Sequence, residues 1–259
     1  MSSIEELNQL LVEKKPLVAM LAPSFPIEFD YPAIINQLRS LGFDKVVEVA
    51  AGAAKTSQQL LELVEKNPNQ RFITSPCPSI VRLIKNSYPH LVKYLTAVDS
   101  PMIQTAKIVK QKFPNHRPVF IGPCPVKKLE AEEDYPELNL LVLTYREIKP
   151  LLAEKKVGLD LPTASFDLAY PATRLYPISG GLAQTTALNS LLTDDEYDVV
   201  SGLPLVQKVL GEFEKSRLRV LDILFCQEGC IMGKGIDSQL TIKQRREKII
   251  SHWGSGEIK

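Results

Sequence analysis

The sequence contains little cysteine, histidine and tryptophan, and it has no excess of either charge. Its 259 residues include four cysteines, three histidines and one tryptophan, and 31 basic residues nearly balance 30 acidic ones. A formal net charge of +1 gives no basic surface of the kind that binds nucleic acid, so no nucleic-acid partner is expected. The basic run KQRREK near the end contains a glutamate and is expected on the solvated face of a terminal helix.

Long hydrophobic runs are also absent. No apolar stretch approaches the roughly 18 residues that indicate a membrane span. The N-terminal MSSIEELNQLLVEKK has the early acids of a short amphipathic helix and no secretory cleavage site. We therefore expect a cytoplasmic protein with no membrane span. Thiols stay reduced in that compartment, which disfavours structural disulfides and leaves metal or redox chemistry as a use for the cysteines.

Short apolar runs alternate with helix-like segments along most of the chain. This alternation predicts an α/β fold with mostly parallel sheets. The expected helices lie at 31–42, 56–67 and 100–113, with Thr56 or Ser57 capping the second and Ser100 the third. The expected strands lie at 16–23, 45–50, 71–76, 118–123, 138–144, 198–202 and 219–225.

All four cysteines fall just beyond the C-terminal ends of expected strands. Cys77 follows the run 71–76, and Cys124 follows 118–123. Cys226 follows 219–225, and Cys230 comes about one helical turn later. Ligands bind at this edge of a parallel α/β sheet, so three distant segments could bring their thiols together there.

Several uses are compatible with four such thiols. They could be small buried hydrophobic side chains. Zinc would accept four thiolates, but one C-x3-C with two solitary cysteines is a poor match to the usual paired knuckles. A [4Fe–4S] cubane accepts four thiolates at almost any spacing, and backbone N–H groups near Pro78, Pro125 and Gly229 could hydrogen-bond its sulfurs. The pattern favours the cubane.

The histidines and the tryptophan offer little further chemistry. His90, His116 and His252 stand beside polar residues or proline and are expected on the surface. Trp253 is expected to pack back on the body of the protein.

The segments that carry the cysteines resemble the signature segments of the [FeFe]-hydrogenase catalytic domain, which is the C-terminal domain of the iron-only hydrogenase large subunit. They are TSPCPSIVRL (74–83), FIGPCPVKKLEA (120–131) and FCQEGCIMGKG (225–235), in the order of that family. The second keeps P-C-x-x-K-x-x-E as Pro123, Cys124, Lys127 and Glu130.

The resemblance covers nearly the whole chain and carries an expected fold. It implies one domain over 1–259, made of two closely packed lobes at approximately 1–115 and 116–245. Each lobe would be a small, mostly parallel sheet flanked by helices, with the cluster between them.

The resemblance also implies a cofactor, the H-cluster, in which a cubane joins through one cysteine sulfur to a two-iron subsite bearing CO and cyanide. Cys230 would be the bridging thiolate. Lys127 and the Pro123 peptide would face one cyanide, and Ser24 with Pro23 the other, because cyanide on iron is a strong acceptor. Lys128 is expected to be a solvated surface lysine. The cubane ligands would be Cys77, Cys124, Cys226 and Cys230.

Three positions depart from the active enzymes of that family. Pro76 stands where they carry a cysteine that shuttles protons, and it has no proton to give. Gly122 and Leu224 stand where they carry methionines. These departures resemble the sensory branch of the family more than the fast enzymes.

The proton path of the family is matched only in part. Glu62 and Thr96 correspond to an acid and a hydroxyl on that path, while Gln59 stands where a second acid is expected. With Pro76, the relay would be interrupted twice, which slows proton transfer without removing a cofactor pocket.

The implied function has two forms. One is slow interconversion of protons and H2, or sensing of H2 or redox state, at an H-cluster. The alternative is a non-catalytic [4Fe–4S] protein that serves electron transfer, a sensor partner or iron–sulfur assembly without the two-iron subsite. No cysteines remain for accessory clusters, so an electron-transfer or signalling protein is expected as partner, with H2 as ligand or substrate.

Overall fold

Parallel strands form two separate sheets in the computed structural model, which describes residues 1–154 and 164–255. The first sheet has the order β2-β1-β4-β5 and the second the order β3-β7-β6. Each expected strand has an observed counterpart, so the predicted α/β class is confirmed. The strands are β1 Leu17–Leu21, β2 Lys45–Glu48, β3 Phe72–Ile73, β4 Arg117–Gly122, β5 Leu141–Thr144, β6 Tyr197–Ser201 and β7 Val220–Leu224.

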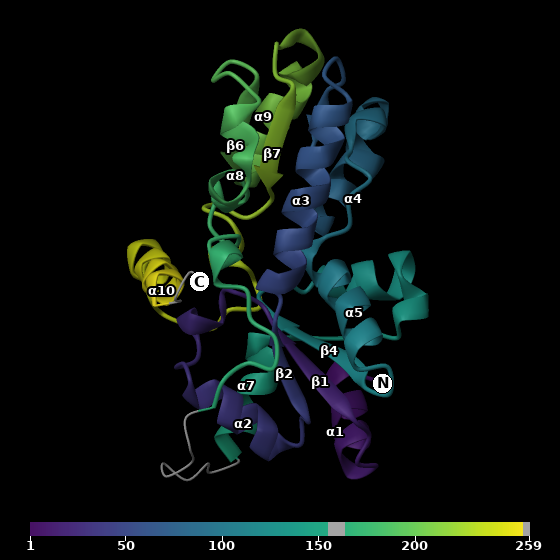
Figure 1. Cartoon of the computed structure of the whole chain (residues 1–259), viewed down its shortest axis with the longest axis vertical. Coiled ribbons are helices and arrows are strands. Elements are labelled where there is room, and N and C mark those ends of the chain that lie inside the picture. Colours follow the sequence, from purple (N-terminus) through teal and green to yellow (C-terminus); the bar gives the residue numbers. More distant parts are fainter. Residues whose placement is uncertain (155–163, 256–259) are drawn as a thin grey trace.

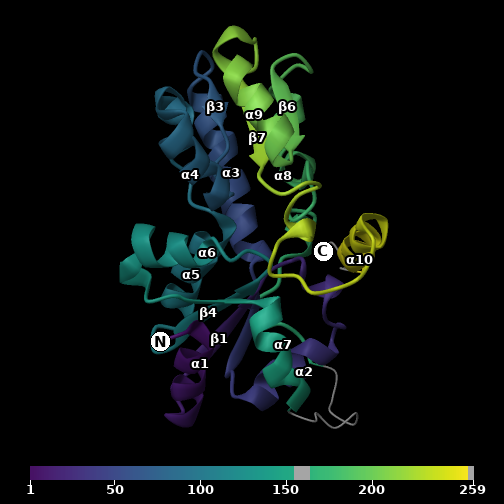
Figure 2. The same ribbon diagram turned by 180° about the vertical axis from the view of Figure 1, so that it is seen from behind.

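Helices flank both sheets. The first sheet lies with α1, α2 and α7 at one end of the molecule, and α3, α4 and α9 surround the second sheet at the other end (Figure 1). The view from behind shows the same separation (Figure 2). The helices are α1 Ser3–Val12, α2 Ala33–Leu41, α3 Ala50–Lys66, α4 Pro78–Ser87, α5 Pro101–Lys112, α6 Lys127–Leu129, α7 Tyr145–Glu154, α8 Gly181–Thr185, α9 Leu203–Glu212 and α10 Ile242–Gly254.

Short turns complete the described chain. A π turn, Glu130–Asp134, continues α6. The 3-10 turns are Phe25–Ile27, Pro89–Tyr94, Pro136–Leu138, Pro171–Thr173, Ala187–Ser190, Phe213–Lys215 and Cys230–Met232.

The two sheets do not follow the expected division of the chain near residue 115. Each takes strands from both sides of that point: β1 and β2 pair with β4 and β5, whereas β3 pairs with β7. The chain therefore crosses between the sheets more than once. Buried parallel strands read as continuous apolar runs whichever sheet they join, so their sequences do not reveal this crossing.

The strands of the first sheet are buried on both faces. Every residue of β1, LVAML, is buried, and β4 is buried after its first residue. One large core cluster surrounds this sheet, and two smaller clusters pack on the second. Burial of this kind, at about 25 cal/mol per Å² of apolar surface, is the main force that stabilises the fold.

Helix boundaries test the expected caps. The Ser100 hydroxyl accepts the Ile103 N–H at the start of α5, as predicted. Helix α3 begins at Ala50, so the expectation that Thr56 or Ser57 caps it is wrong. Alanine is the best helix former, and the run AAGAAK extends the helix toward its N-terminus. Thr56 lies inside the helix and donates to the Gly52 carbonyl at 3.1 Å.

The C-terminal helix confirms one expectation and corrects another. The basic run lies in α10 with Lys243, Arg246 and Lys248 exposed, and Trp253 packs against the core. His252, expected on the surface, is instead buried. Its polar neighbours in the sequence concealed a contact with a residue far along the chain.

That contact is a buried ionic cluster centred on Glu48. Arg174 Nε lies 2.8 Å from the Glu48 carboxylate, and His252 Nε2 lies 3.4 Å from it. Burial raises the pKa of Glu48, but hydrogen bonds from His252 and Arg174 outweigh it and hold that pKa below its ordinary value. The cluster joins α10 to the end of β2.

Among the described residues, no helix combines the length and the hydrophobicity that crossing a lipid bilayer requires.

Gly52 lets α3 approach α5 closely, which leads to a test of stability. A Cβ at this position would overlap the Pro101 carbonyl oxygen and the Thr105 hydroxyl. Gly52→Ala should lower the free energy of unfolding by about 1–3 kcal/mol through overpacking. Chemical denaturation of the full chain measures the change.

Gly211→Ala is the matched control. Gly211 lies in α9, is exposed, and has open space where a Cβ would go. This change should stabilise the helix by about 0.5–1 kcal/mol. Equal effects of the two substitutions would contradict the close approach of α3 and α5.

Candidate functional site

The structure brings the four cysteines together from three strand ends. Cys77 is the N-cap of α4 after β3, and Cys124 follows β4. Cys226 follows β7, and Cys230 begins a 3-10 turn. All four are free thiols, and the charge on any one would act on the others. The two sheets therefore meet at a cluster of thiols.

The surroundings of these thiols disfavour free thiolates. Burial, together with the charges of the neighbouring thiols, raises the pKa of Cys226 to about 11 and that of Cys230 well above its ordinary value. Burial also raises the pKa of Cys124, although Lys127 and the Val126 N–H act against it. A bound cationic group would offset this cost, because metal ligation stabilises the deprotonated thiol.

The donor set of this site consists of sulfur alone. Within 1–154 and 164–255, no group of three or more His, Cys, Asp or Glu side chains is arranged to hold one metal ion. A cubane spaces its four thiolates around a core of several atoms, and four sulfur donors suit its irons.

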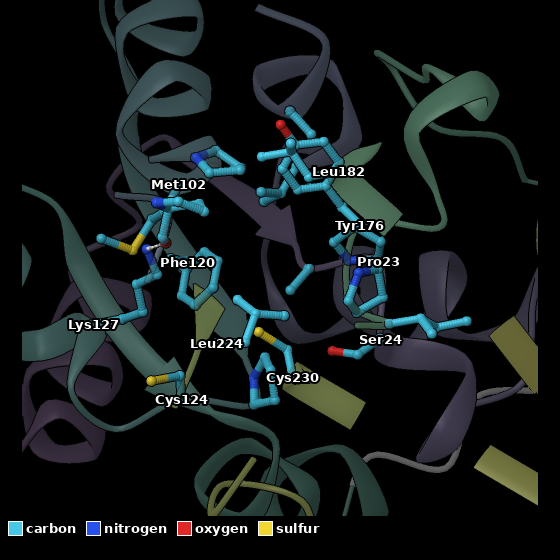
Figure 3. Close-up of a pocket in the computed structure, with 18 of the residues that line it drawn as sticks. Pro23, Ser24, Met102, Phe120, Cys124, Lys127, Tyr176, Leu182, Leu224 and Cys230 are labelled. Atoms are coloured by element: carbon cyan, nitrogen blue, oxygen red, sulfur yellow. Dashed lines mark hydrogen bonds between the residues drawn. The ribbon is translucent and has the colours of Figure 1, made fainter. Parts of the chain in front are cut away.

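An apolar cavity of about 80 Å³ adjoins the thiols. Cys124 and Cys230 line it, and Figure 3 shows Lys127 and Ser24 on opposite sides of Cys230 in that view. Because Cys230 lines this space, part of its surface is accessible although the residue lies deep in the protein. Apolar walls with a few polar groups are typical of cofactor sites.

Lys127 is a buried cation at the edge of this cavity. Its Nζ lies 2.6 Å from Glu130 Oε2 and donates to the Pro76 carbonyl at 3.3 Å. Lys128 is not the solvated lysine that was expected, because it is half-buried and pairs with Glu147 at 2.5 Å. The two lysines point to different partners, and only Lys127 lines the cavity.

Ser24 is held by a tyrosine that the sequence did not suggest. Its Oγ lies 2.8 Å from the hydroxyl of Tyr145, which donates to the Ala22 carbonyl at 3.0 Å. Burial keeps Tyr145 neutral by raising its pKa. Tyr145 lies 121 positions from Ser24 and follows an apolar strand, so only the pairing of β4 with β5 reveals the contact.

Phe120 explains the glycine at position 122. A Cβ on Gly122 would overlap the ring of Phe120, which lines the cavity. The two residues lie on the same face of β4, because strand side chains alternate. The Phe120 ring therefore occupies the space that a side chain at position 122 would need.

The remaining predicted residues lie further out. Glu62 is half-exposed on α3, where it accepts from Gln58 and pairs with Lys66. Thr96 is buried, with its hydroxyl 2.7 Å from Ser75 Oγ. Gln59 accepts from Gln104 at 2.6 Å. Neither Glu62 nor Thr96 lines the cavity beside Cys230.

The segment after Cys230 packs against the loop that carries Cys124. The Gly235 N–H donates to the Pro123 carbonyl at 2.8 Å, and a Cβ on Gly233 would overlap that same oxygen. Met232 and Lys234 interrupt the glycines without occupying these positions. The glycines thus fix the third cysteine segment against the second.

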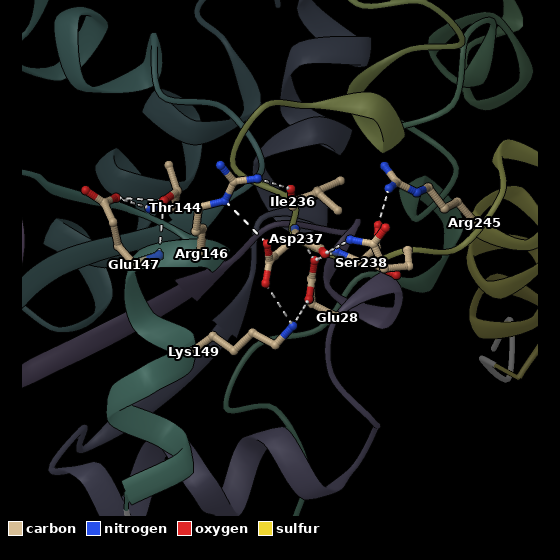
Figure 4. Close-up of polar contacts among 10 residues, drawn as sticks. Glu28, Thr144, Arg146, Glu147, Lys149, Ile236, Asp237, Ser238 and Arg245 are labelled. Carbon is tan, nitrogen blue, oxygen red and sulfur yellow. Dashed lines mark hydrogen bonds and ion pairs between the residues drawn. The ribbon is translucent and has the colours of Figure 1, made fainter.

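A polar network centred on Glu28 holds the same segment further along (Figure 4). The buried Glu28 carboxylate accepts the Asp237 and Ser238 N–H groups, and Lys149 Nζ lies 2.9 Å away. Arg245 donates to the Ser238 carbonyl at 2.5 Å. These contacts bind the chain beyond Cys230 to the end of the 3-10 turn Phe25–Ile27, to α7 and to α10.

Comparison with known proteins agrees with this geometry. A family model for the iron only hydrogenase large subunit, C-terminal domain, matches residues 15–234. Iron hydrogenase 1 of Clostridium pasteurianum is 26% identical over 293 residues, covering 88% of this chain and 51% of that protein. The chain therefore spans about half the length of this relative.

Other relatives carry a different name. Cytosolic Fe-S cluster assembly factor NAR1 of Yarrowia lipolytica is 28% identical over 142 residues, which is 47% of this chain and 28% of that protein. The same factor from Encephalitozoon cuniculi is 25% identical over 187 residues, which is 63% of this chain and 51% of that protein.

A solved structure shares the fold. A variant of the [FeFe]-hydrogenase HydA1 from Chlamydomonas reinhardtii superposes with a TM-score of 0.75 at 20% identity, covering 98% of this chain and 88% of that one. The expected arrangement of two parallel sheets flanked by helices is thereby confirmed.

The Glu28 network predicts a loss of stability when its acceptor is weakened. Glu28→Gln replaces one carboxylate oxygen by an amide NH2, which would face either the two N–H groups or the Lys149 ammonium. Leaving such groups unsatisfied should lower the free energy of unfolding by about 1–3 kcal/mol. Denaturant titration of the full chain measures the loss.

Glu132→Gln serves as control for this change, because Glu132 is exposed on the π turn. A surface carboxylate of this kind should contribute less than about 0.5 kcal/mol. The same small effect at both positions would show that Glu28 does not anchor the segment.

Proposed function

The chain belongs to the family defined by the C-terminal domain of the iron-only hydrogenase large subunit, and from this premise we propose that it holds a [4Fe–4S] cubane and a two-iron subsite. The cubane ligands in this proposal are Cys77, Cys124, Cys226 and Cys230. One observation carries the proposal: thiols from three strand ends meet beside an apolar cavity that Lys127 and Ser24 border.

Cys230 is the proposed bridge between the two parts of the cofactor. It lines the cavity with Cys124 and is the more deeply buried of the two, and this burial raises its pKa well above that of a free thiol. Once bound, the two-iron subsite would supply the redox chemistry that interconverts protons, electrons and H2. The chain itself would bind this group, orient it and keep water away.

The polar residues at the edge of the cavity suit cyanide ligands. The Lys127 ammonium is held in place by Glu130 and by the Pro76 carbonyl, so its remaining donor capacity has a fixed direction. Ser24 is fixed by Tyr145 on the other side, and its hydroxyl proton is free for a cyanide when Tyr145 donates to Ser24 in place of the Ala22 carbonyl. Charged and hydroxyl donors bind strong acceptors best where water is excluded. Pro23 lines the cavity beside Ser24, and Pro123 lines it on the side of Lys127.

Slow turnover, or sensing of H2 or redox state, follows from Pro76. This residue contributes a carbonyl oxygen to the Lys127 contact but no exchangeable proton. Proton delivery by a positioned side chain typically contributes about 10²–10⁴-fold to a rate, so its loss would leave binding intact and turnover slow. An electron-transfer or signalling protein would be the partner, and H2 the ligand or substrate.

A cytoplasmic location is part of the proposal. It rests on the reduced thiols that the cluster needs and on the word cytosolic in the names of two relatives.

A second candidate function is a four-iron protein without the two-iron subsite, acting in electron transfer or iron–sulfur assembly. The similarity to NAR1 and the proline at position 76 favour it. It uses the same four cysteines and leaves the cavity without a cofactor role.

Iron content tests the part that the two candidates share. The full chain, reconstituted without oxygen, should bind about four iron ions as one cubane. Cys124→Ser should lower the bound iron and weaken the cluster absorption, because serine is a poor ligand for these irons. A wild-type chain that retains no iron after desalting would contradict both candidates.

Infrared spectroscopy separates the two candidates. After incubation of the reconstituted chain with a synthetic two-iron cofactor, sharp CO and cyanide bands should survive desalting. Lys127→Met should shift a cyanide band, because it removes a donor that borders the cavity. Lys128→Met is the matched control and should leave every band in place, since Lys128 pairs with Glu147.

Bands that wash out while the four irons remain would favour the second candidate. A cyanide band that shifts equally in both lysine variants would contradict the proposed role of Lys127.

A further inference from the structure

Asp222 is a buried acid that the functions described above do not use. It lies in the middle of β7, is 2% exposed, and lines the cavity beside Cys230. The Thr74 hydroxyl donates to its Oδ1 at 3.0 Å. Among the described residues, no cationic side chain contributes to the shift of its pKa. A carboxylate without a cationic partner is costly inside a protein.

The surroundings of Asp222 allow its carboxyl group to bind and release a proton. Burial raises the pKa of Asp222 to about 6, although Thr74 and Tyr197 act against it. Tyr176 and Tyr197 face it, and burial raises the pKa of both phenols, so they stay neutral. The Tyr197 hydroxyl is buried and lies close enough to Asp222 to lower the pKa of the carboxyl by hydrogen bonding.

The raised pKa also costs stability. Between the pKa of an unfolded aspartate and about 6, the native chain binds more protons than the unfolded one. Asp222 therefore weakens the fold progressively as pH rises through this window, and the full cost remains above it. A buried group that lowers stability marks a functional position more often than a structural one.

Hydroxyl groups lead from Asp222 toward solvent. Thr74 also lines a small cavity of about 10 Å³, which it shares with Ser75 and Thr96. That volume corresponds to about one water molecule. Ser75 and Thr96, whose hydroxyls lie 2.7 Å apart, also line a wide polar groove of about 590 Å³. The groove and the small cavity thus share Ser75 and Thr96, and the hydrogen bond from Thr74 to Asp222 connects the small cavity to the one beside Cys230.

We propose that Asp222 holds the proton exchanged at the cavity, and that Thr74 with the Ser75–Thr96 pair connects it to the groove. When the carboxyl is protonated, the Thr74 hydroxyl turns to accept from it and to donate to a water molecule in the small cavity. The carboxyl proton passes to the Thr74 oxygen, the Thr74 proton to this water, a water proton to the Ser75 oxygen, and the Ser75 proton through Thr96 to the groove. Each transfer breaks one O–H bond and forms another, so the net result is one proton carried outward with no electron transferred. This route goes around Pro76. The proposal rests on the proposed function in one respect, which is the identity of the group in the cavity that exchanges this proton with Asp222.

The first experiment identifies the carboxyl. Infrared difference spectra of the full chain with its reconstituted cubane should show a protonated carboxyl band that titrates near pH 6. Asp222→Asn should remove this band. Asp198→Asn is the matched control on the neighbouring strand, because Asp198 is only half-buried and does not line the cavity, and it should keep the band. A titrating band that survives in Asp222→Asn, or no such band, would overturn the proposal.

The second experiment tests the route and does not need the Asp222→Asn variant to fold. After rapid dilution into D2O, the band shifts as the carboxyl proton exchanges. Thr74→Val should slow this shift by about tenfold or more, and Thr74→Ser should restore it, because only the hydroxyl relays the proton. Equal rates in wild type and Thr74→Val would overturn the route.

Neither readout requires the two-iron subsite. Loss of the CO and cyanide bands would therefore contradict the proposed function while leaving the Asp222 route intact. An unaltered exchange rate in Thr74→Val would contradict the Asp222 route while leaving the proposed function intact.

Discussion

Four thiols must share one partly buried site, and this requirement shapes the molecule. Burial raises the pKa of Cys226 and Cys230, and each thiol raises the pKa of its neighbours further. Without a cation, the site favours neutral thiols. With one, the same burial strengthens every contact, because a low dielectric increases the attraction between thiolates and iron. The C-terminal edges of two different sheets must therefore face one another, and the chain crosses between the sheets to achieve this.

Contacts made by residues other than the cysteines hold the thiol-bearing segments against one another. The Gly235 N–H and the close approach at Gly233 fix the third cysteine segment to Pro123, beside Cys124. Glu28, at the end of the 3-10 turn Phe25–Ile27, then binds the following residues. A cubane requires all four sulfurs at once, so a shift of one segment would weaken the whole site. Second-layer contacts of this kind orient ligands that the first layer alone would leave loose.

The sequence predicted what is encoded locally. Buried parallel strands read as apolar runs, so all the observed strands were found, and the cysteines at their ends followed. Tyr145, Phe120 and Asp222 were missed because each lies in or beside an apolar strand and gains its role from distant partners. His252 was misplaced for the same reason, since Glu48 lies 204 positions away. The expected division into two lobes near residue 115 does not match the observed sheets, because the sequence of a buried strand does not indicate which sheet it joins.

Pro76 shows how a lost group can leave a site otherwise intact. Its contribution to the cavity is a backbone carbonyl that accepts from Lys127, and any residue at this position could supply it. A thiol would add only an exchangeable proton. Under the proposed function, its absence would slow proton delivery and leave the binding groups in place. The neighbouring Thr74 and Ser75 keep hydroxyls on the same strand end, beside the small cavity that Pro76 also lines. A hydroxyl ionises far less readily than a thiol, so it can pass a proton along a chain but cannot hold and release one by itself at neutral pH.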